Sequence, residues 1–187
     1  MRWERLFTDV EAQFAAELDR EHASEVADRI RAEIGRVRFR DRTAVAHGSM
    51  LTMWVLGADP GVLSGELRAS GPDWMLLAER EGMETLVPLH AVTAVSGLGS
   101  ASRAPEQESR LQARLDLGYV LSGIARDRAP VSIVLTDGHL LGGTIDRVGA
   151  DLIEVAEHHT GDYRRPSAVT GVWSVRTGAL ALVRRAS

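Results

Sequence analysis

The chain contains no cysteine, which excludes disulfide bonds and thiolate metal sites and favours a cytoplasmic location. Lysine is also absent, so every basic side chain is an arginine, whose planar guanidinium suits phosphate pairing and base stacking. No apolar run approaches the roughly 18 residues of a membrane span, and the acidic start MRWERLFTDVE does not resemble a secretion signal. The net charge of -4 argues against non-specific nucleic-acid binding by the whole surface. We therefore expect a cytoplasmic protein without a membrane partner.

Sequence signals for catalysis are missing as well. No nucleophile elbow, phosphate loop or paired-carboxylate motif occurs. The stretch EHHTGD places His158, His159 and Asp162 close together, but adjacent histidines in a strand face opposite ways. We therefore predict a protein that is not an enzyme and has no catalytic residues, no metal site and no cofactor.

The N-terminal part has the apolar spacing of a helix. Apolar residues recur at steps of three or four, first at Trp3, Phe7, Val10, Phe14 and Leu18 and then at Val26, Ile30 and Ile34. After Gly35 the pattern is ambiguous, because Val37 and Phe39 alternate with arginines in a way that also suits a strand. We expect a helical arm over residues 1–46, with the structure of 35–46 undecided.

From about residue 49 the apolar period changes to two, which predicts short strands. Turn compositions separate five such segments, namely SMLTMWVL, VLSGELRA, WMLLAER, METLVPL and HAVTAVSG. A helix is expected around Leu117, Leu121 and Ile124, and five more strand segments follow it: APVSIVLT, HLLGGTIDRV, DLIEVAEH, YRRPSAVTGVWSV and ALALV. The predicted domains are a first β unit at 47–99, a linker at 100–109 and a helix with a second β unit at 110–187.

The two β blocks are an internal repeat. VLSGELRASGPDWMLLAE (62–79) aligns with LLGGTIDRVGADLIEVAE (140–157) at a constant offset of 78, and HAVTAV (90–95) aligns with SAVTGV (167–172) at an offset of 77. Glycines coincide in the first alignment, as Gly65 does with Gly143. Chance similarity between two β-rich stretches is the weaker explanation, because the offset holds through a turn.

A glycine inside a strand permits a sharp bend and a close backbone approach. Asp137-Gly138 suits a tight primed hairpin turn between the strands on either side. Val134 is apolar although it points away from the expected core, which suits cover by a helix lid or a neighbouring subunit. We therefore predict that each block closes into a small five-stranded β-barrel.

The stretch RAPVSIVLTDGHLLGGTI (128–145), with LGYVLSGIARDR before it, resembles the opening of the bacterial Sm-like RNA chaperones, the Hfq family. LHAVTAV in the first block is similar to the Lys-His-Ala-Ile-Ser-Thr-Val segment of that family. The resemblance covers both β blocks and the second helix. It implies a mainly β chain of the α+β class, with tandem Sm-like (SH3-like) five-stranded β-barrels behind the helical arm.

The resemblance also implies which residues contact RNA. The arginines on the rim of the family's ring fall on Arg126 and Arg128, and the histidine of its uridine-binding face falls on His90. From composition alone, Arg36, Arg38 and Arg40 belong to an arginine-rich strip at 29–42, which would bind phosphates or pair with the acidic first helix. Large aromatic residues could stack on bases or fill a core, as at Trp54 and Trp74.

These observations predict a non-enzymatic Sm-like protein that binds RNA in a regulatory or chaperone-like role. The alternative is a scaffold for protein–protein interaction that has lost the RNA pocket, with the amphipathic N-terminal stripe as the docking surface. In the resembling family, barrels join edge to edge into rings, which implies a homo-oligomer here. Either three chains form a six-barrel ring, or two chains form a dimer.

Overall fold

The computed structural model describes residues 17, 20, 22–103, 114–159 and 165–185. The chain divides into two compact units between Arg38 and Phe39. In the first unit, residues 22–34 are helical, which confirms the helix predicted there. The apolar stripe predicted from Trp3 to Leu18 lies outside the described residues.

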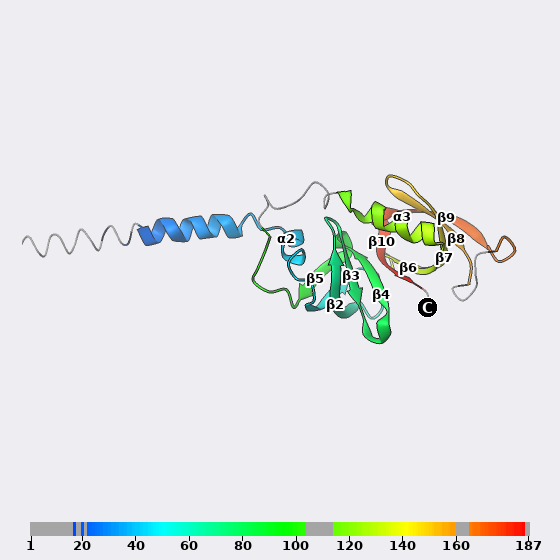
Figure 1. Cartoon of the computed structure of the whole chain (residues 1–187), viewed down its shortest axis with the longest axis horizontal. Helices are drawn as coiled ribbons and strands as arrows, with labels where there is room; N and C mark the ends of the chain where they lie inside the picture. Colours follow the sequence, from blue (N-terminus) through cyan, green and yellow to red (C-terminus); the bar gives the residue numbers. More distant parts are fainter. Residues whose placement is uncertain (1–16, 18–19, 21, 104–113, 160–164, 186–187) are drawn as a thin grey trace, which may run out of the picture. The chain divides into compact units, whose positions relative to one another are not determined.

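The described residues of the second unit form two α-helices and ten strands, and Figure 1 shows their arrangement. Its elements in chain order are α2 (Phe39–Thr43), β1 (Met50–Val55), β2 (Val62–Ser70), β3 (Trp74–Ala78), η1 (Arg80–Gly82), β4 (Glu84–Pro88), η2 (Leu89–Ala91), β5 (Val92–Ser96), α3 (Leu117–Asp127), β6 (Pro130–Leu135), β7 (Leu140–Val148), β8 (Leu152–Glu157), β9 (Gly171–Arg176), η5 (Thr177–Ala179) and β10 (Leu180–Arg185). Each strand falls within or overlaps a predicted segment, and α3 confirms the predicted second helix. The undecided region 35–46 contains the short helix α2.

The strands form one continuous antiparallel sheet in the order β5-β1-β2-β3-β4-β10-β6-β7-β8-β9. The prediction of two tandem, closed, Sm-like barrels is therefore wrong. A closed barrel requires the two outer strands of each half to pair with each other, whereas β4 pairs with β10 across the boundary. The sheet is open, and among the described residues β5 and β9 form its edges. β10, the last strand along the chain, lies near the middle of the sheet.

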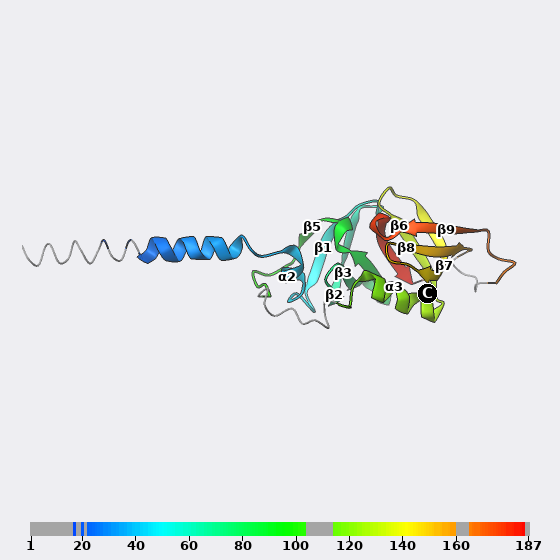
Figure 2. The same cartoon turned by 90° about the horizontal axis from the view of Figure 1, so that it is seen from above.

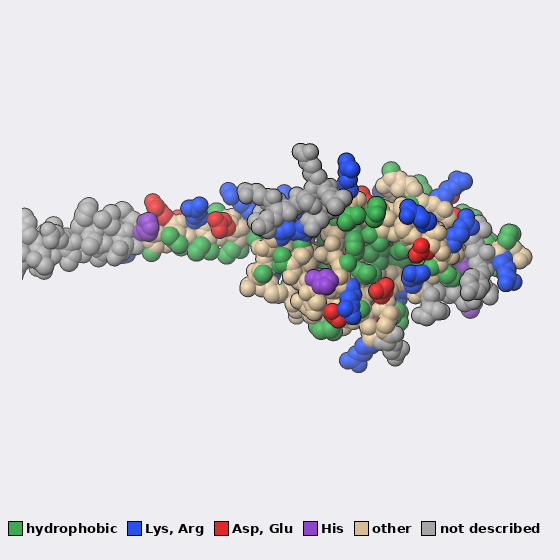
Figure 3. All heavy atoms as spheres, viewed as in Figure 1, with side chains coloured by type: hydrophobic (Ala, Val, Ile, Leu, Met, Phe, Trp, Pro, Cys, Tyr) green, Lys and Arg blue, Asp and Glu red, His purple; other side chains and the backbone are tan. Residues whose placement is uncertain are grey.

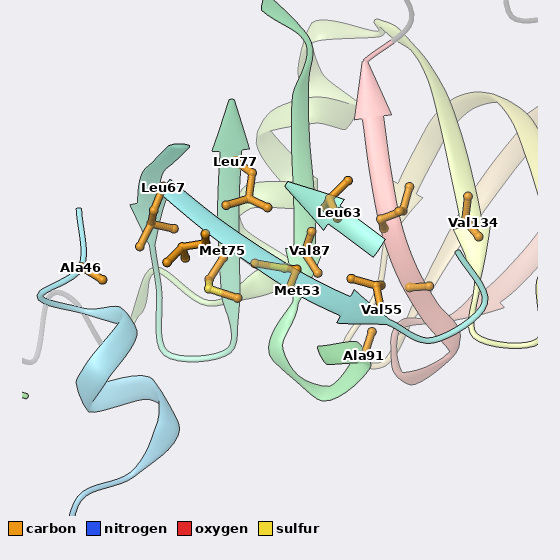
Figure 4. Close-up of a cluster of buried hydrophobic side chains, with 13 residues drawn as sticks. Ala46, Met53, Val55, Leu63, Leu67, Met75, Leu77, Val87, Ala91 and Val134 are labelled. Carbon is orange, nitrogen blue, oxygen red and sulfur yellow. The ribbon is translucent and has the colours of Figure 1, made fainter. Parts of the chain in front are cut away.

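Contacts between the halves extend from the backbone into the cores. One cluster of buried side chains belongs mainly to β1–β5 but also contains Val134, Ala181 and Leu182 of the second half (Figure 4). The other cluster belongs mainly to β6–β10 and α3 but contains Trp74 and Leu86 of the first half. The first half of the same chain thus supplies the cover expected for Val134, and neither a helix lid nor a neighbouring subunit is needed.

The repeat is visible in the structure as a repeated strand order, with β10-β6-β7-β8-β9 following the same plan as β5-β1-β2-β3-β4. A Cβ on Gly143 would overlap the carbonyl oxygen of Ala156, and one on Gly65 would lie 2.7 Å from that of Ala78. The close backbone approach predicted at these glycines is therefore confirmed. In β2 and β7 a bulge follows the glycine, and it bends the strand without closing a barrel.

Two local predictions need correction. The alignment of 90–95 with 167–172 is wrong, because His90 lies in η2 and the matching turn of the second half is η5, which follows β9. The turn at Asp137-Gly138 is not a two-residue primed turn. Gly138 N–H donates to Leu135 O at 2.9 Å and Leu135 N–H donates to His139 O at 2.9 Å, which encloses three residues with Gly138 at φ 91°. This is a type I turn followed by a glycine bulge.

We predict that Gly143→Ala destabilises the protein by about 2 kcal/mol or more, because its Cβ would overlap the backbone of β8. Gly123→Ala is the matched control, since Gly123 lies in α3 with no atom within 4 Å of an added Cβ. This second change should stabilise the protein by up to about 1 kcal/mol through helix propensity. Urea unfolding of both variants measures the two effects, and a neutral Gly143→Ala would contradict the close approach.

Candidate nucleic-acid interface

Helix α3 carries the best-placed cationic residues, and both halves of the sheet hold it in position (Figure 2). Asp116 caps its first turn by accepting a hydrogen bond from Tyr119 N–H at 2.8 Å. Asp73 of the first half accepts a hydrogen bond from Leu117 N–H at 2.8 Å, and Trp74 Nε1–H donates to Leu115 O at 2.8 Å. The buried face of the helix packs on the strands of the second half. The helix is therefore fixed relative to the whole sheet.

Partial burial raises the pKa of Asp73 above its ordinary value. The hydrogen bond from Leu117 N–H opposes this shift, whereas the neighbouring charge of Asp116 adds to it. The pKa of Asp73 rises in the folded protein because desolvation outweighs the hydrogen bond. Asp73 therefore anchors α3, and its protonated form is favoured more in the folded protein than in the unfolded chain.

The C-terminal end of α3 presents two exposed arginines. Arg126 lies in the last turn, and Arg128 follows as the C-cap in the left-handed conformation, with φ 51° and its N–H donating to Ala125 O at 3.2 Å. A cation at this end interacts favourably with the negative end of the helix dipole. The left-handed cap ends the helix and directs the chain into β6.

These arginines line an open depression of about 410 Å³ between α3 and β7. The lining consists of three arginines, one carboxylate and three small or apolar residues: Arg126, Arg128, Arg147, Asp146, Ser122, Ala125 and Val148. Nearby acids are already paired, since Asp127 lies 3.8 Å from Arg185 and Glu154 lies 3.6 Å from Arg147. Within the described residues, no carboxylate lies within 4.0 Å of the guanidinium of Arg126 or Arg128. Local charge is therefore positive although the chain is acidic.

An aromatic ring extends this surface. Tyr119 precedes Arg126 by seven residues, which places both on the same side of α3 about 10.5 Å apart along its axis. The Tyr119 side chain is 62% exposed and available for stacking. We call Tyr119, Arg126, Arg128 and Arg147 the α3 surface. It combines three guanidinium groups with one aromatic face.

The other predicted nucleic-acid residues lie on other elements. Arg36 and Arg38 belong to the first unit, whereas Arg40 lies in α2 of the second. His90 lies in η2 with Nε2 3.0 Å from Leu180 O, where it contributes to the contact between the halves. Trp74 is buried and anchors α3, as the core alternative for that residue predicted.

The histidines of EHHTGD form no site among the residues that the structure describes. His158 is buried, with Nδ1 2.9 Å from His159 O and Nε2 2.8 Å from Thr144 Oγ1, so both ring nitrogens are engaged. Asp162 lies outside the described residues. In the described ranges no three His, Asp or Glu side chains cluster as metal ligands would, and no helix is both long and apolar enough to span a bilayer.

Two residues of the α3 surface were missed from the sequence. Tyr119 could have been found, because a spacing of seven from Arg126 places it on the same helix face. Arg147 could not, because its position beside Arg126 depends on how β7 packs against α3.

No protein-family model matches the chain, and no curated protein is similar enough to count as a relative. These comparisons therefore do not identify the Sm-like family.

We predict that Asp73→Ala destabilises the protein by about 1–2 kcal/mol, because Leu117 N–H loses its acceptor. Asp73→Asn keeps an acceptor oxygen and should cost less. Chemical denaturation at neutral pH measures both free energies of unfolding. An equal loss in the two variants would contradict the hydrogen bond as the cause.

Because the pKa of Asp73 is raised in the folded protein, the stability difference between wild type and Asp73→Asn should depend on pH. The folded state holds the Asp73 proton more tightly than the unfolded chain, so the contribution of this proton is greatest in acid and is lost as pH rises through the folded-state pKa. Asp73→Asn does not titrate, so its stability relative to wild type should improve from about pH 3 to pH 7. A difference that stays constant over this range would contradict the shift.

Proposed function

We propose that the protein binds single-stranded RNA non-covalently through the α3 surface. The observation that supports this most directly is the placement of Arg126, Arg128 and Arg147 around one open depression. Guanidinium groups pair with phosphate oxygens through planar, charge-assisted hydrogen bonds. Because the chain as a whole carries a net charge of -4, we expect binding through a local cluster of arginines such as this one and not over the whole surface.

Tyr119 favours a single strand over a double helix as the ligand. An exposed ring offers a face on which an unpaired base can stack, whereas the bases of a duplex are already stacked on one another. The distance of about 10.5 Å along the helix from Tyr119 to Arg126 leaves room for a strand to place a base on the ring and a phosphate at the arginines. The depression is open, which suits a chain that continues past it.

The scaffold alternative is supported by a separate feature. In the first unit, helical residues 22–34 expose Val26, Ile30 and Ile34 along one side (Figure 3). These residues are four positions apart, so they form an apolar stripe that suits docking to a protein partner. This role is compatible with RNA binding by the second unit.

We expect a labelled single-stranded RNA to bind in fluorescence anisotropy with an affinity that falls as salt rises, by about 0.7 log units per log unit of salt for each phosphate contacted. The double variant Arg126→Glu, Arg128→Glu should bind at least about tenfold more weakly and with a smaller salt slope. Arg80→Glu is the control for net charge, because Arg80 is an exposed arginine in η1, away from the α3 surface.

Tyr119→Ala separates stacking from charge. It should weaken binding by about 1–3 kcal/mol, as expected for a lost base stack, while the salt slope stays unchanged. A single-stranded DNA of the same sequence tests whether the ribose 2′-hydroxyl contributes. Binding that is insensitive to salt, or that is weakened equally by Arg80→Glu, would rule out the α3 surface as the RNA site.

A further inference from the structure

The helix at residues 22–34 of the first unit exposes its apolar side. Every residue of this helix is exposed, and the apolar ones gather along one side (Figure 3). The side chains of Val26, Ile30 and Ile34 are 48%, 50% and 66% exposed. Helices in proteins gain most of their stability from packing of their apolar face. This stripe is therefore a contact surface, and the residues beside it indicate what it contacts.

Four charged residues of alternating sign follow one flank of the stripe. Successive residues of an α-helix are rotated by about 100°, which places Glu25, Arg29 and Glu33 on the same side of Ile30. Arg36 continues this flank, because its N–H donates to Glu33 O at 3.1 Å in the turn that follows the helix. Read along the chain, the flank is negative, positive, negative and positive.

This order of charges is complementary to itself when a second helix runs in the opposite direction. A two-fold axis near residues 30 and 31 places Arg29 of one copy opposite Glu33 of the other. The same axis places Glu25 opposite Arg36, and each of these pairs occurs twice. Within one chain Arg29 Nε lies 3.8 Å from Glu33 Oε1, and both side chains are well exposed, so a second copy can reach them.

The apolar stripe obeys the same symmetry. The axis that matches the charges brings Ile30 against Ile30 of the second copy, and it brings Val26 beside Ile34. Spacings of four residues on both helices allow the side chains of one stripe to lie between those of the other. Apolar contact and charge pairing therefore require one and the same register.

A parallel pair would lack this match. It would bring the charged flank against the opposite flank of the second helix, which carries Ala27 and Arg31 and offers Arg29 no carboxylate. Arg31 is already held within its own helix, with Nη2 2.6 Å from Asp28 Oδ1. The charges therefore favour the antiparallel orientation.

We propose that the helix at residues 22–34 pairs with the same helix of a second copy of this chain, in antiparallel orientation about a two-fold axis near Ile30. The contact is isologous, because both copies contribute the same residues. It belongs to the first unit, so it involves neither edge of the sheet and does not depend on RNA binding by the α3 surface. The contact is short, so association depends on protein concentration.

The test reverses one charge at a time. Glu33→Arg leaves only cations at the two central positions of the flank, and Arg29→Glu leaves only carboxylates there. Each variant of the full chain should self-associate at least about tenfold more weakly than wild type in analytical ultracentrifugation, because like charges face each other across the axis.

An equimolar mixture of Glu33→Arg and Arg29→Glu should associate again, because the cations of one chain face the carboxylates of the other. Each chain in the mixture keeps its own substitution, so weaker helix formation cannot explain the recovery. A mixture that associates no better than the separate variants would overturn the proposal.

Two further variants locate the contact. Ile30→Glu places two carboxylates at the axis and should abolish association, whereas Ala32→Arg adds a charge on the opposite side of the same helix and should associate as wild type does. The proposal fails if wild type stays monomeric up to about 1 mM. It also fails if Ile30→Glu associates as wild type does, or if Ala32→Arg is as weak as Glu33→Arg.

Discussion

The pairing of β4 with β10 is the interaction on which the rest of the structure depends. Without it the second unit would consist of two separate five-stranded sheets, each near the lower size limit for a stable core. The pairing places Val134 and Leu182 inside the first core and Leu86 inside the second, so each half completes the other. The Glu79–Arg184 ion pair adds specificity, since a largely buried carboxylate is costly unless its one cation arrives in register.

The position of the α3 surface depends on the pairing of the two halves, because α3 contacts both of them. The helix starts on Asp73 and Trp74 of the first half, and its body packs on the second half. Arg126 and Arg128 are therefore held by an element that bridges the two halves, while Arg147 stands on a strand of the sheet. A helix fixed in this way can present a rigid set of cations, which lowers the entropy lost on binding a flexible ligand.

Much of the secondary structure could be predicted because it depends on local pattern. Segments of alternating apolar residues predicted each of the strands that the structure describes, and the coincident Gly65 and Gly143 indicated the repeat and the close backbone contacts. Closure of the sheet could not be predicted, because an edge strand has the same pattern whether it pairs within its own half or across the boundary. The pairing includes an ion pair between Glu79 and Arg184, a residue far away in sequence.

The candidate site also contains residues that could be predicted from the sequence and residues that could not. Arg126 and Arg128 were predicted from a family resemblance, and the structure places them at the C-terminal end of α3. Tyr119 could have been predicted from helical spacing. Arg147 becomes a member only through packing between α3 and β7, which no linear pattern encodes. His90 was predicted as an RNA contact, but its Nε2 lies within hydrogen-bond distance of the backbone oxygen of Leu180 in β10, ninety residues away in sequence.

The central position of β10 in the sheet has a consequence for the synthesis of the protein on the ribosome. β4 is synthesised well before its neighbour β10, so its edge stays unpaired while all of β6–β9 is synthesised. Nascent chains that follow one another along a single messenger RNA would meanwhile display identical unpaired edges at high local concentration. Glu79 would lack its ion-pair partner Arg184 in any contact made before β10 is synthesised, and the cost of leaving this carboxylate unpaired disfavours such contacts.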